Sequence, residues 1–296
     1  MKIALFTRTG FHHTYFINRL QEEFEIACVV REEYPEEGGR ETGHASTSRD
    51  SIAGNGTDRT GDALFLERFH AAYSAGFRYH PVLREYLKSP FDVVIKQPGT
   101  EYVNVGCGEI NSSDFISFLR GVRPDVVAVL GSSVIKPSVI SVPSHAIMIN
   151  LHSGLSPYYR GTWSYGWPIV NGEPEYIGGT VHHVNPGIDT GDVIYQTRPV
   201  FTDNDDLNSI FLKVVSEGVE LVARALGEIR DSGTVDSWRQ PENTGRLYRT
   251  KDLTADAART CLSNLENGII RKYNAARTER DSGVSLYGYV PPKIYV

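Results

Sequence analysis

The stretch Ala146-Ile147-Met148-Ile149-Asn150-Leu151-His152-Ser153-Gly154-Leu155-Ser156-Pro157-Tyr158-Tyr159-Arg160-Gly161 decides how the chain is interpreted. It begins with four apolar residues, after a proline and before a Gly/Ser/Pro cluster, which predicts a short strand. Asn150 and His152 then lie at the carboxyl end of that strand. Because strand side chains alternate between faces, this amide and this imidazole project from the same side.

A second stretch, Pro186-Gly187-Ile188-Asp189-Thr190-Gly191-Asp192, offers a carboxylate that we expect beside this strand end. An Asn amide can donate to a developing oxyanion, an imidazole can carry a proton, and a carboxylate can orient the imidazole and raise its pKa. The ordinary alternatives are a turn-forming Asn, a structural His and a plain hairpin turn. Only the two stretches together indicate acyl-transfer chemistry.

Together with Gly178-Gly179-Thr180-Val181-His182, these stretches resemble the N10-formyltetrahydrofolate-dependent formyltransferases, the family of glycinamide ribonucleotide, methionyl-tRNA and sugar N-formyltransferases. The order Asn-x-His, Gly-x-Thr-Val-His and Ile-Asp-Thr-Gly matches that family, and Asp189 follows His152 by 37 residues. The resemblance covers residues 124–228 well and the first hundred residues in outline. Ser156 departs from it, because many relatives have Leu before the Pro. The resemblance implies that Asn150, His152 and Asp189 are catalytic.

The predicted fold is α/β: a Rossmann-like formyltransferase domain with a mostly parallel sheet (residues 1–230) and a small C-terminal extension (residues 231–296). We expect no strand-rich, barrel-like second domain. Apolar runs predict strands at 3–6, 26–30, 93–95, 126–130, 146–152, 177–184 and 193–200. Periodicity predicts helices at 12–24, 113–120, 203–230 and 254–274, and two helices within 63–87. Residues 32–62 are polar and predict a long insertion.

The resemblance also implies which residues bind the co-substrate, N10-formyltetrahydrofolate. The loop after strand 126–130 would hydrogen-bond the pterin through its backbone, and a second segment would close the other side of the pocket. These residues are Leu130, Gly131, Ser132, Ser133, Val134 and Ile135, and then Val184, Gly187 and Ile188. A plain strand-to-helix turn at Gly131-Ser132-Ser133 is the alternative interpretation.

For the acceptor, the resemblance implies contacts from Tyr102 and Asn104, within a predicted loop at 98–111, and we also expect a contact from Arg160. We predict no metal, because His182 and His183 are adjacent on a strand and face opposite sides. Gly10 stands alone after the first strand, so the Gly-x-Gly-x-x-Gly fingerprint of a nicotinamide enzyme is absent.

Composition narrows the classes of function. The 296 residues carry a net charge of −6, which argues weakly against a nucleic acid partner. Three scattered cysteines, Cys28, Cys107 and Cys261, form neither a disulfide framework nor a metal motif, so we expect a reducing, cytoplasmic location. No apolar run in the sequence reaches the length of a membrane span, and residues 1–6 have too little apolar length to predict a signal peptide.

The expected activity is transfer of a formyl group to a primary amine of a small molecule, and we expect a nucleotide-linked amino sugar. The alternatives are an amino acid or hydroxylamine acceptor in natural-product assembly, a formyltetrahydrofolate deformylase, and a non-catalytic folate-binding protein. Deformylases usually carry an additional amino-terminal domain, whereas this sequence starts at its first strand. A homodimer is compatible with the sequence, which does not specify the oligomeric state.

Overall fold

The structure is a computed structural model that describes residues 1–33, 59–79, 90–142, 146–242 and 244–292. A seven-stranded sheet in the order β3-β2-β1-β4-β5-β7-β8 forms its centre, and β6 and β9 form a separate two-stranded sheet. The strands are β1 (Ile3–Arg8), β2 (Ile26–Glu33), β3 (Glu101–Gly106), β4 (Val126–Leu130), β5 (Ile147–His152), β6 (Tyr159–Gly161), β7 (Gly179–His183), β8 (Val193–Thr197) and β9 (Arg246–Tyr248).

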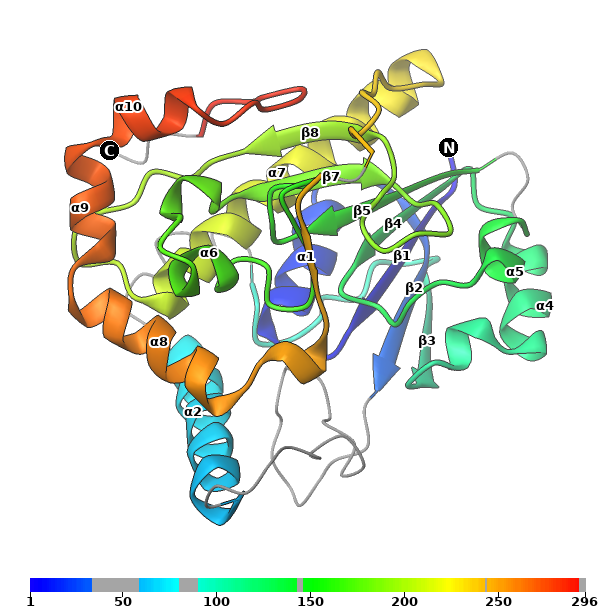
Figure 1. The fold of residues 1–296 in the computed structure, drawn as a ribbon. Helices are drawn as coiled ribbons and strands as arrows, with labels where there is room; N and C mark the ends of the chain where they lie inside the picture. Colours follow the sequence, from blue (N-terminus) through cyan, green and yellow to red (C-terminus); the bar gives the residue numbers. More distant parts are fainter. Residues whose placement is uncertain (34–58, 80–89, 143–145, 243, 293–296) are drawn as a thin grey trace.

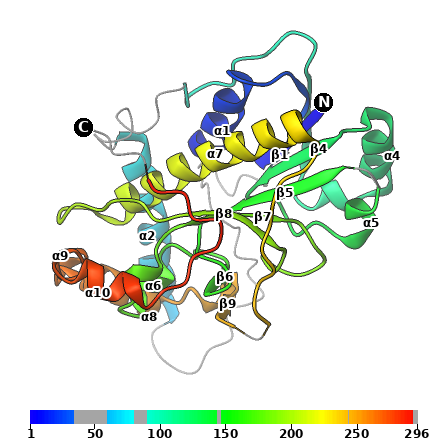
Figure 2. The same ribbon diagram turned by 90° about the horizontal axis from the view of Figure 1, so that it is seen from above.

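Helices cover both faces of the large sheet (Figures 1 and 2). The α-helices are α1 (Phe11–Gln21), α2 (Arg59–Tyr79), α4 (Ser113–Val122), α5 (Pro137–Ile140), α6 (Trp167–Val170), α7 (Leu207–Ser232), α8 (Ala255–Glu266), α9 (Ile269–Ala275) and α10 (Arg277–Ser282). The short 3-10 helices are η2 (Glu109–Asn111), η3 (Pro174–Tyr176) and η4 (Thr250–Asp252).

The strand pairing follows the apolar pattern of the sequence. β3, β2, β1, β4 and β5 run parallel, and β7 and β8 join β5 antiparallel. Every residue of β4 is buried, as expected for a strand covered on both faces. One core lies under α1 and α7, and a second core lies under η2, α4 and α5. The predicted Rossmann-like α/β fold is therefore confirmed.

Helix α7 lies directly against the strand that carries the central motif. Its start is fixed by a capping box, in which Asp206 accepts from the Ser209 N–H and Ser209 accepts from the Asp206 N–H. A Cβ atom on Gly218 would lie 2.5 Å from Leu151 Cδ1. This glycine therefore allows α7 to approach Leu151, between Asn150 and His152.

The third strand was predicted in the wrong place. Residues 93–95 form a loop, because the Asn18 side chain binds the Val93 carbonyl and the Ile95 N–H, which are then not available for strand pairing. The strand is β3, within the segment that was predicted as a loop, and it pairs with β2 over six residues. As an edge strand with partly exposed side chains, β3 lacks the apolar run that identifies a central strand.

Two helix predictions also need correction. The predicted helix at 254–274 is divided into α8 and α9 at Gly268, which has a φ of 71°. Within residues 63–87, the described part is one helix, α2, which continues through Gly76. Residues 80–89 lie outside the described part, so the second predicted helix stays a prediction. Most of the predicted insertion, residues 34–58, lies outside it too.

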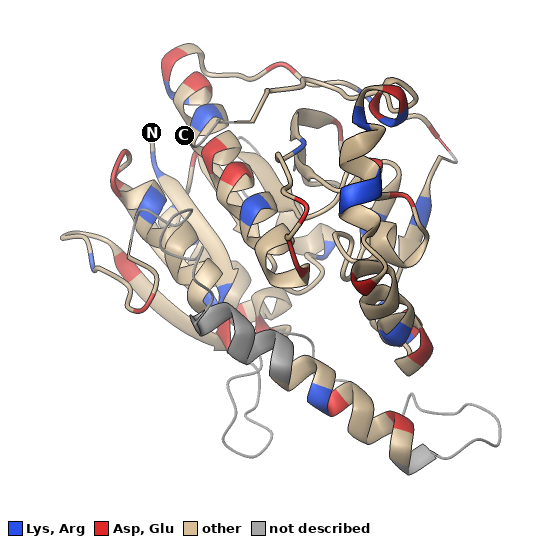
Figure 3. Ribbon diagram, turned by 90° about the vertical axis from the view of Figure 1, so that its left-hand side faces the viewer, with Lys and Arg blue, Asp and Glu red and all other residues tan. Residues whose placement is uncertain are grey.

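The C-terminal extension packs closely on the rest of the fold. Cys261, Ile270 and Tyr273 belong to the main core, and β9 pairs with β6. The division into two domains at residue 230 stays a prediction. In the part of the chain that the structure describes, no helix has the length and hydropathy to cross a membrane. Acidic and basic residues are interspersed along the described helices on the side drawn in Figure 3.

A buried ion pair at the entry to α7 gives a prediction about stability. Lys213 Nζ lies 2.5 Å from Asp205 Oδ2, and the two side chains are only 3% and 5% exposed. Replacing Asp205 by Ala leaves a buried ammonium without its counter-charge. We expect Asp205→Ala to lower the free energy of unfolding by about 3 kcal/mol in urea titrations.

The matched control is Glu242→Ala, which breaks the exposed ion pair with Arg239, whose partners are 78% and 73% exposed. Its free energy of unfolding should change by less than about 0.5 kcal/mol. An equal loss in both variants would contradict a special role for the buried pair.

Candidate active site

The site forms where β5 ends between two neighbours. β4 lies parallel to β5 with Leu130 beside Leu151, and β7 lies antiparallel with His182 opposite Asn150. Asn150 is partly buried and His152 is buried. The polar strand end predicted from the sequence therefore lies at the carboxyl edge of the parallel sheet, where ligands bind in open α/β folds.

The hairpin between β7 and β8 brings in Asp189. Gly191 has no room for a side chain, because a Cβ atom there would lie 1.6 Å from the His183 carbonyl oxygen. Asp189 itself has a φ of 52°, a left-handed conformation that is uncommon for residues other than glycine. The hairpin turn thus returns over β5 and directs the carboxylate toward His152.

Asp189 and His152 face each other in a nearly closed environment. His152 Nδ1 lies 3.4 Å from Asp189 Oδ2, and the side chains are 6% and 15% exposed. The Gly161 N–H donates to the same carboxylate oxygen at 2.8 Å. The other ring nitrogen, His152 Nε2, lies 2.8 Å from the carbonyl oxygen of Tyr159. Both imidazole nitrogens therefore face hydrogen-bond acceptors.

Burial and charge shift the two pKa values in ways that suit proton handling. Burial lowers the pKa of His152, while the Asp189 carboxylate opposes that shift. For Asp189, burial acts to raise the pKa, but His152, His182 and the Gly161 N–H together hold it well below its usual range. At neutral pH the pair is therefore a neutral imidazole beside an ionised carboxylate.

His182 is a member of the site whose role the sequence did not predict. Asn150 Nδ2 lies 3.1 Å from His182 Nε2, and His182 Nδ1 lies 2.8 Å from the His183 carbonyl. The backbone thus holds the ring on its Nδ1 side, and Nε2 lies between the Asn150 amide and the Asp189 carboxylate. Its Nε2 is also 3.5 Å from Asp189 Oδ1. The signal was the Thr-Val-His strand after the Asn-x-His motif, because the pairing of β7 with β5 puts His182 opposite Asn150.

The predicted co-substrate loop, Leu130–Ile135, begins on the strand beside β5. Glu32, which is fully buried, accepts from the Ser133 N–H at 2.5 Å, and Asn111 donates to the Val134 carbonyl at 3.0 Å. The Val134 side chain is 68% exposed. The loop therefore presents an apolar side chain from a backbone that the protein holds in place. Its binding role stays a prediction.

On the other side of β5, the second predicted co-substrate segment follows β7. The Val184 N–H donates to the Met148 carbonyl at 2.8 Å. Gly187 and Ile188 lie in the turn that leads directly to Asp189, and Gly187 is exposed. The structure thus brings these residues to the edge where Asn150 and His152 lie.

The three predicted acceptor contacts lie in two different places. Tyr102 and Asn104 lie on β3, four strands from β5 and therefore about 19 Å away at the usual strand spacing. The structure does not bring them to Asp189 and His152. Arg160 lies on β6, and its charge contributes to lowering the pKa of His152. Its Nε is buried without a hydrogen-bond partner among the described residues.

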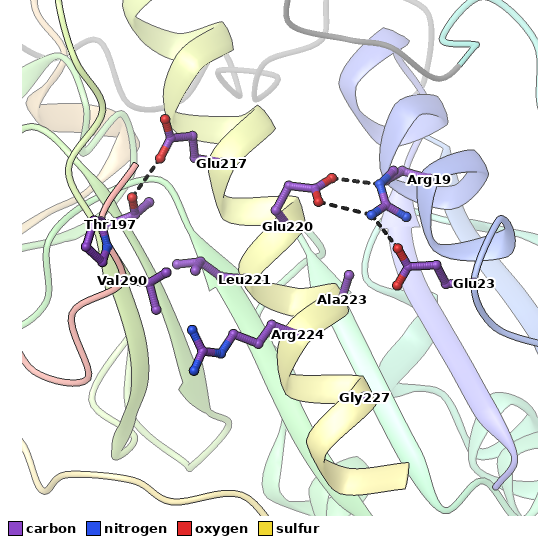
Figure 4. Close-up of a pocket in the computed structure, with 11 residues that line it drawn as sticks. Arg19, Glu23, Thr197, Glu217, Glu220, Leu221, Ala223, Arg224, Gly227 and Val290 are labelled. Carbon is purple, nitrogen blue, oxygen red and sulfur yellow. Dashed lines mark hydrogen bonds and ion pairs between the residues drawn. The ribbon is translucent and has the colours of Figure 1, made fainter. Parts of the chain in front are cut away.

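A cavity of about 400 Å³ lies along α7, and none of its lining residues belongs to this site (Figure 4). Arg19 binds Glu220 with two hydrogen bonds there, and the Thr197 hydroxyl donates to Glu217. Its main charged groups are thus already paired. Among the described residues, no cluster of three or more His, Cys, Asp or Glu side chains could hold a metal ion.

Residues 86–226 match the family model described as formyl transferase. The methionyl-tRNA formyltransferase of Pelotomaculum thermopropionicum is 32% identical over 119 residues, which cover 40% of this chain and 37% of the relative. The enzyme of the same name from Thermodesulfovibrio yellowstonii is 28% identical over 191 residues, covering 62% and 59%. The chain thus matches less than two thirds of the length of these relatives.

Solved structures share the fold at low identity. A sugar N-formyltransferase from a Shewanella species has a TM-score of 0.50 at 14% identity, covering 90% of this chain and 88% of that one. An N-formyltransferase from Helicobacter canadensis, in complex with folinic acid and dTDP-3-aminofucose, has a TM-score of 0.50 at 14% identity, covering 86% and 72%. Over residues 86–226, a little under half of its length, the chain is therefore similar to the formyl transferase family, and these solved structures share its fold.

Proposed function

We propose that this protein transfers the formyl group of N10-formyltetrahydrofolate to a primary amine of a small-molecule acceptor. The observation that carries the proposal is the meeting of Asn150, His152 and Asp189 at the sheet edge, within the residues that match the formyl transferase family. In this reaction the acceptor nitrogen bonds to the formyl carbon, the bond from that carbon to N10 breaks, and a proton passes from the amine to N10.

Asn150 is assigned to the oxyanion. One N–H of its amide is used by His182, and the second can donate to the formyl oxygen as that atom gains negative charge. Such a donor typically accelerates acyl transfer about a hundred- to a thousandfold. Because His182 orients the amide before substrate binds, this stabilisation needs no rearrangement during the reaction.

His152 and Asp189 are assigned to the proton. The lowered pKa of His152 keeps its imidazole neutral. Because Nε2 donates to the Tyr159 carbonyl, the lone pair on Nδ1, beside Asp189, is the one that would accept the proton of the attacking amine. The depressed pKa of Asp189 makes this carboxylate a weak base, so it stabilises the imidazolium rather than keeping the proton. The same imidazolium can then protonate the leaving nitrogen.

The co-substrate pocket is assigned to the loop at Leu130–Ile135 and to Val184, Gly187 and Ile188. These residues flank β5 on both sides, and the exposed Val134 side chain suits a planar ring. The Helicobacter canadensis protein, which shares the fold, was crystallised with folinic acid. N10-formyltetrahydrofolate would supply the formyl group at this edge.

For the acceptor, we favour an amino sugar linked to a nucleotide. The Arg160 guanidinium lies near His152 and has a buried N–H that no described group accepts, so an anionic acceptor such as a sugar nucleotide could bind it. The Helicobacter canadensis complex contains such an amino sugar. The curated relatives are methionyl-tRNA formyltransferases, but they match only part of the chain.

The direct experiment is mass spectrometry of the protein incubated with N10-formyltetrahydrofolate and a panel of amines. The panel includes nucleotide-linked amino sugars, amino acids and methionyl-tRNA, with a control that lacks any acceptor. A formylated sugar nucleotide supports the proposal. Formylated methionyl-tRNA would show that the acceptor is tRNA and not an amino sugar. Free formate without acceptor would indicate a deformylase, and unconsumed folate would contradict formyl transfer altogether.

The assignment of the triad is tested by substitution. We expect His152→Ala to lower kcat about a hundred- to ten-thousandfold, because it removes the proton acceptor, and Asp189→Asn to act similarly. His70→Ala, which removes a partly buried histidine of α2, should leave kcat unchanged. Circular dichroism checks that each variant is folded. Full turnover in a folded Asp189→Asn protein would remove Asp189 from the mechanism.

The pH dependence follows from the direction of the His152 shift. The neutral imidazole is the active form, so kcat/KM should fall as pH decreases through the pKa of His152. Because burial lowers that pKa from its ordinary 6.5, the acidic limb should lie below pH 6.5. In Asp189→Asn the opposing carboxylate is lost, and the limb should move to still lower pH. Profiles from about pH 5 to 9 with one acceptor test this; a limb above pH 7 would contradict it.

Arg160 gives a separate test of the acceptor. We expect Arg160→Met to raise the KM for a nucleotide-linked sugar about tenfold or more, because a charge-assisted hydrogen bond is lost. The acidic limb should also move to higher pH, because Arg160 contributes to lowering the pKa of His152. An unchanged KM would show that this cation does not meet the acceptor. Arg239→Met, at an exposed position, is the matched control.

A further inference from the structure

We propose that Gln240 is a positioning residue that fixes the carboxylate of Asp189 for the reaction. The proposal rests on the proposed function. It also goes beyond the family match, because residues 86–226 end before Gln240. Gln240 lies in the segment between α7 and β9, for which we predicted no function from the sequence.

Gln240 holds the Asp189 turn from both sides. Its Nε2 donates to the Asp189 carbonyl at 2.9 Å and to the Gly191 carbonyl at 2.6 Å, and the residue is only 8% exposed. A side-chain amide nitrogen has two N–H groups, so both are used here. The Oε1 atom of Gln240 is buried without a partner among the described residues. Among the described residues, Gln240 therefore holds the turn through its two N–H groups and not through its Oε1 atom.

The turn needs such a support because its backbone is strained. Asp189 adopts a φ of 52°, in a region that residues other than glycine occupy only at a cost in free energy. Strained conformations persist where surrounding contacts fix them. Gly161 N–H holds the side chain of Asp189, and Gln240 holds the backbone. Without Gln240, the Asp189 carboxylate still accepts from the Gly161 N–H, but the Asp189 carbonyl loses its hydrogen bond to the Gln240 amide.

The segment that carries Gln240 is itself firmly attached. Trp238 and Val193 exchange two backbone hydrogen bonds, of 2.7 and 2.8 Å. After Gln240, the chain reaches β9, which pairs with β6 and therefore with Gly161. A Cβ atom on Gly161 would lie 2.0 Å from the Tyr248 carbonyl oxygen, so the two backbones are in direct contact. The C-terminal chain thus contacts both segments that anchor Asp189.

Loss of the Gln240 hydrogen bonds is expected to change the electrostatic environment of His152 as well as the geometry of the turn. His152 is faced by Asp189, by His182, by Arg160 and by the Tyr159 carbonyl. Of the charged side chains among them, Asp189 alone favours the imidazolium, while His182 and Arg160 oppose it. A carboxylate that moves away therefore leaves the imidazolium less stable. The pKa of His152 becomes a reporter of the position of Asp189.

The test uses Gln240→Met, which keeps the volume and removes both donors. NMR titration of the His152 ring in protein without substrate should show a pKa lower than in the unchanged protein, by about one unit. The matched control is Gln97→Met. Gln97 also donates to backbone carbonyls, those of Phe24 and Gln21, but far from the site. Its substitution should leave the His152 pKa unchanged.

Kinetics supply the second readout. We expect Gln240→Met to lower kcat about tenfold or more, since a displacement of about 1 Å can reduce a rate a hundredfold, with the KM for the formyl donor unchanged. Gln97→Met should keep kcat within about twofold. If Gln240→Met fails to fold, Gln240→Asn keeps one amide on a shorter stem and should give a smaller shift of the same sign.

Two results would overturn the proposal. One is a folded Gln240→Met protein with an unchanged His152 pKa and unchanged kcat. The other is an equal effect of the Gln240 and Gln97 substitutions, which would indicate a general loss of stability. The titration needs no substrate, so it is independent of the proposed function. If the unchanged protein transfers no formyl group, that function fails, and the titration alone decides whether Gln240 holds Asp189.

Discussion

The contact between the Asp189 carboxylate and the His152 imidazole is the interaction on which the site depends. Burying an ionised carboxylate is costly, and the cost is offset only where charges and hydrogen-bond donors surround it. Here those groups come from separate parts of the chain: His152 from β5, His182 from β7 and the Gly161 N–H from β6. The carboxylate therefore requires these strands to be assembled, and the charge to which we assign a catalytic role is available only in the folded protein.

The sheet topology explains how these groups meet. The parallel strands bring the carboxyl end of β5 beside the loop after β4, whereas β7 runs antiparallel from His152 back to Met148, and the turn after it folds back so that Asp189 meets His152. A parallel strand in place of β7 would have needed a long crossover and would have left no tight turn near His152. The change of strand direction after β5 is thus the feature that lets Asp189 reach the imidazole.

Much of this was predictable from the sequence, and the failures have a common cause. The buried strands and α7 carry strong periodic signals, and Asn150, His152 and Asp189 stand in a recognisable order. The edge strand β3 was missed because partial exposure removes the apolar run. His182 and Gln240 were missed because their roles come from tertiary contacts. His182 meets Asn150, 32 residues away on the neighbouring strand, and Gln240 meets carbonyls 49 and 51 residues away. No local pattern records such partners.

Tertiary contacts of this kind also explain why the C-terminal segment matters for a site built by earlier residues. The Asp189 turn has a left-handed residue and is flanked by Gly187 and Gly191, so its local conformational preferences are weak. A weakly determined turn would place the carboxylate over a range of positions, and the field at His152 would vary with them. Two donors from one buried amide restrict that range at the cost of one side chain. On this proposal, the final position of the Asp189 carboxylate is set by residues outside the motif that supplies it.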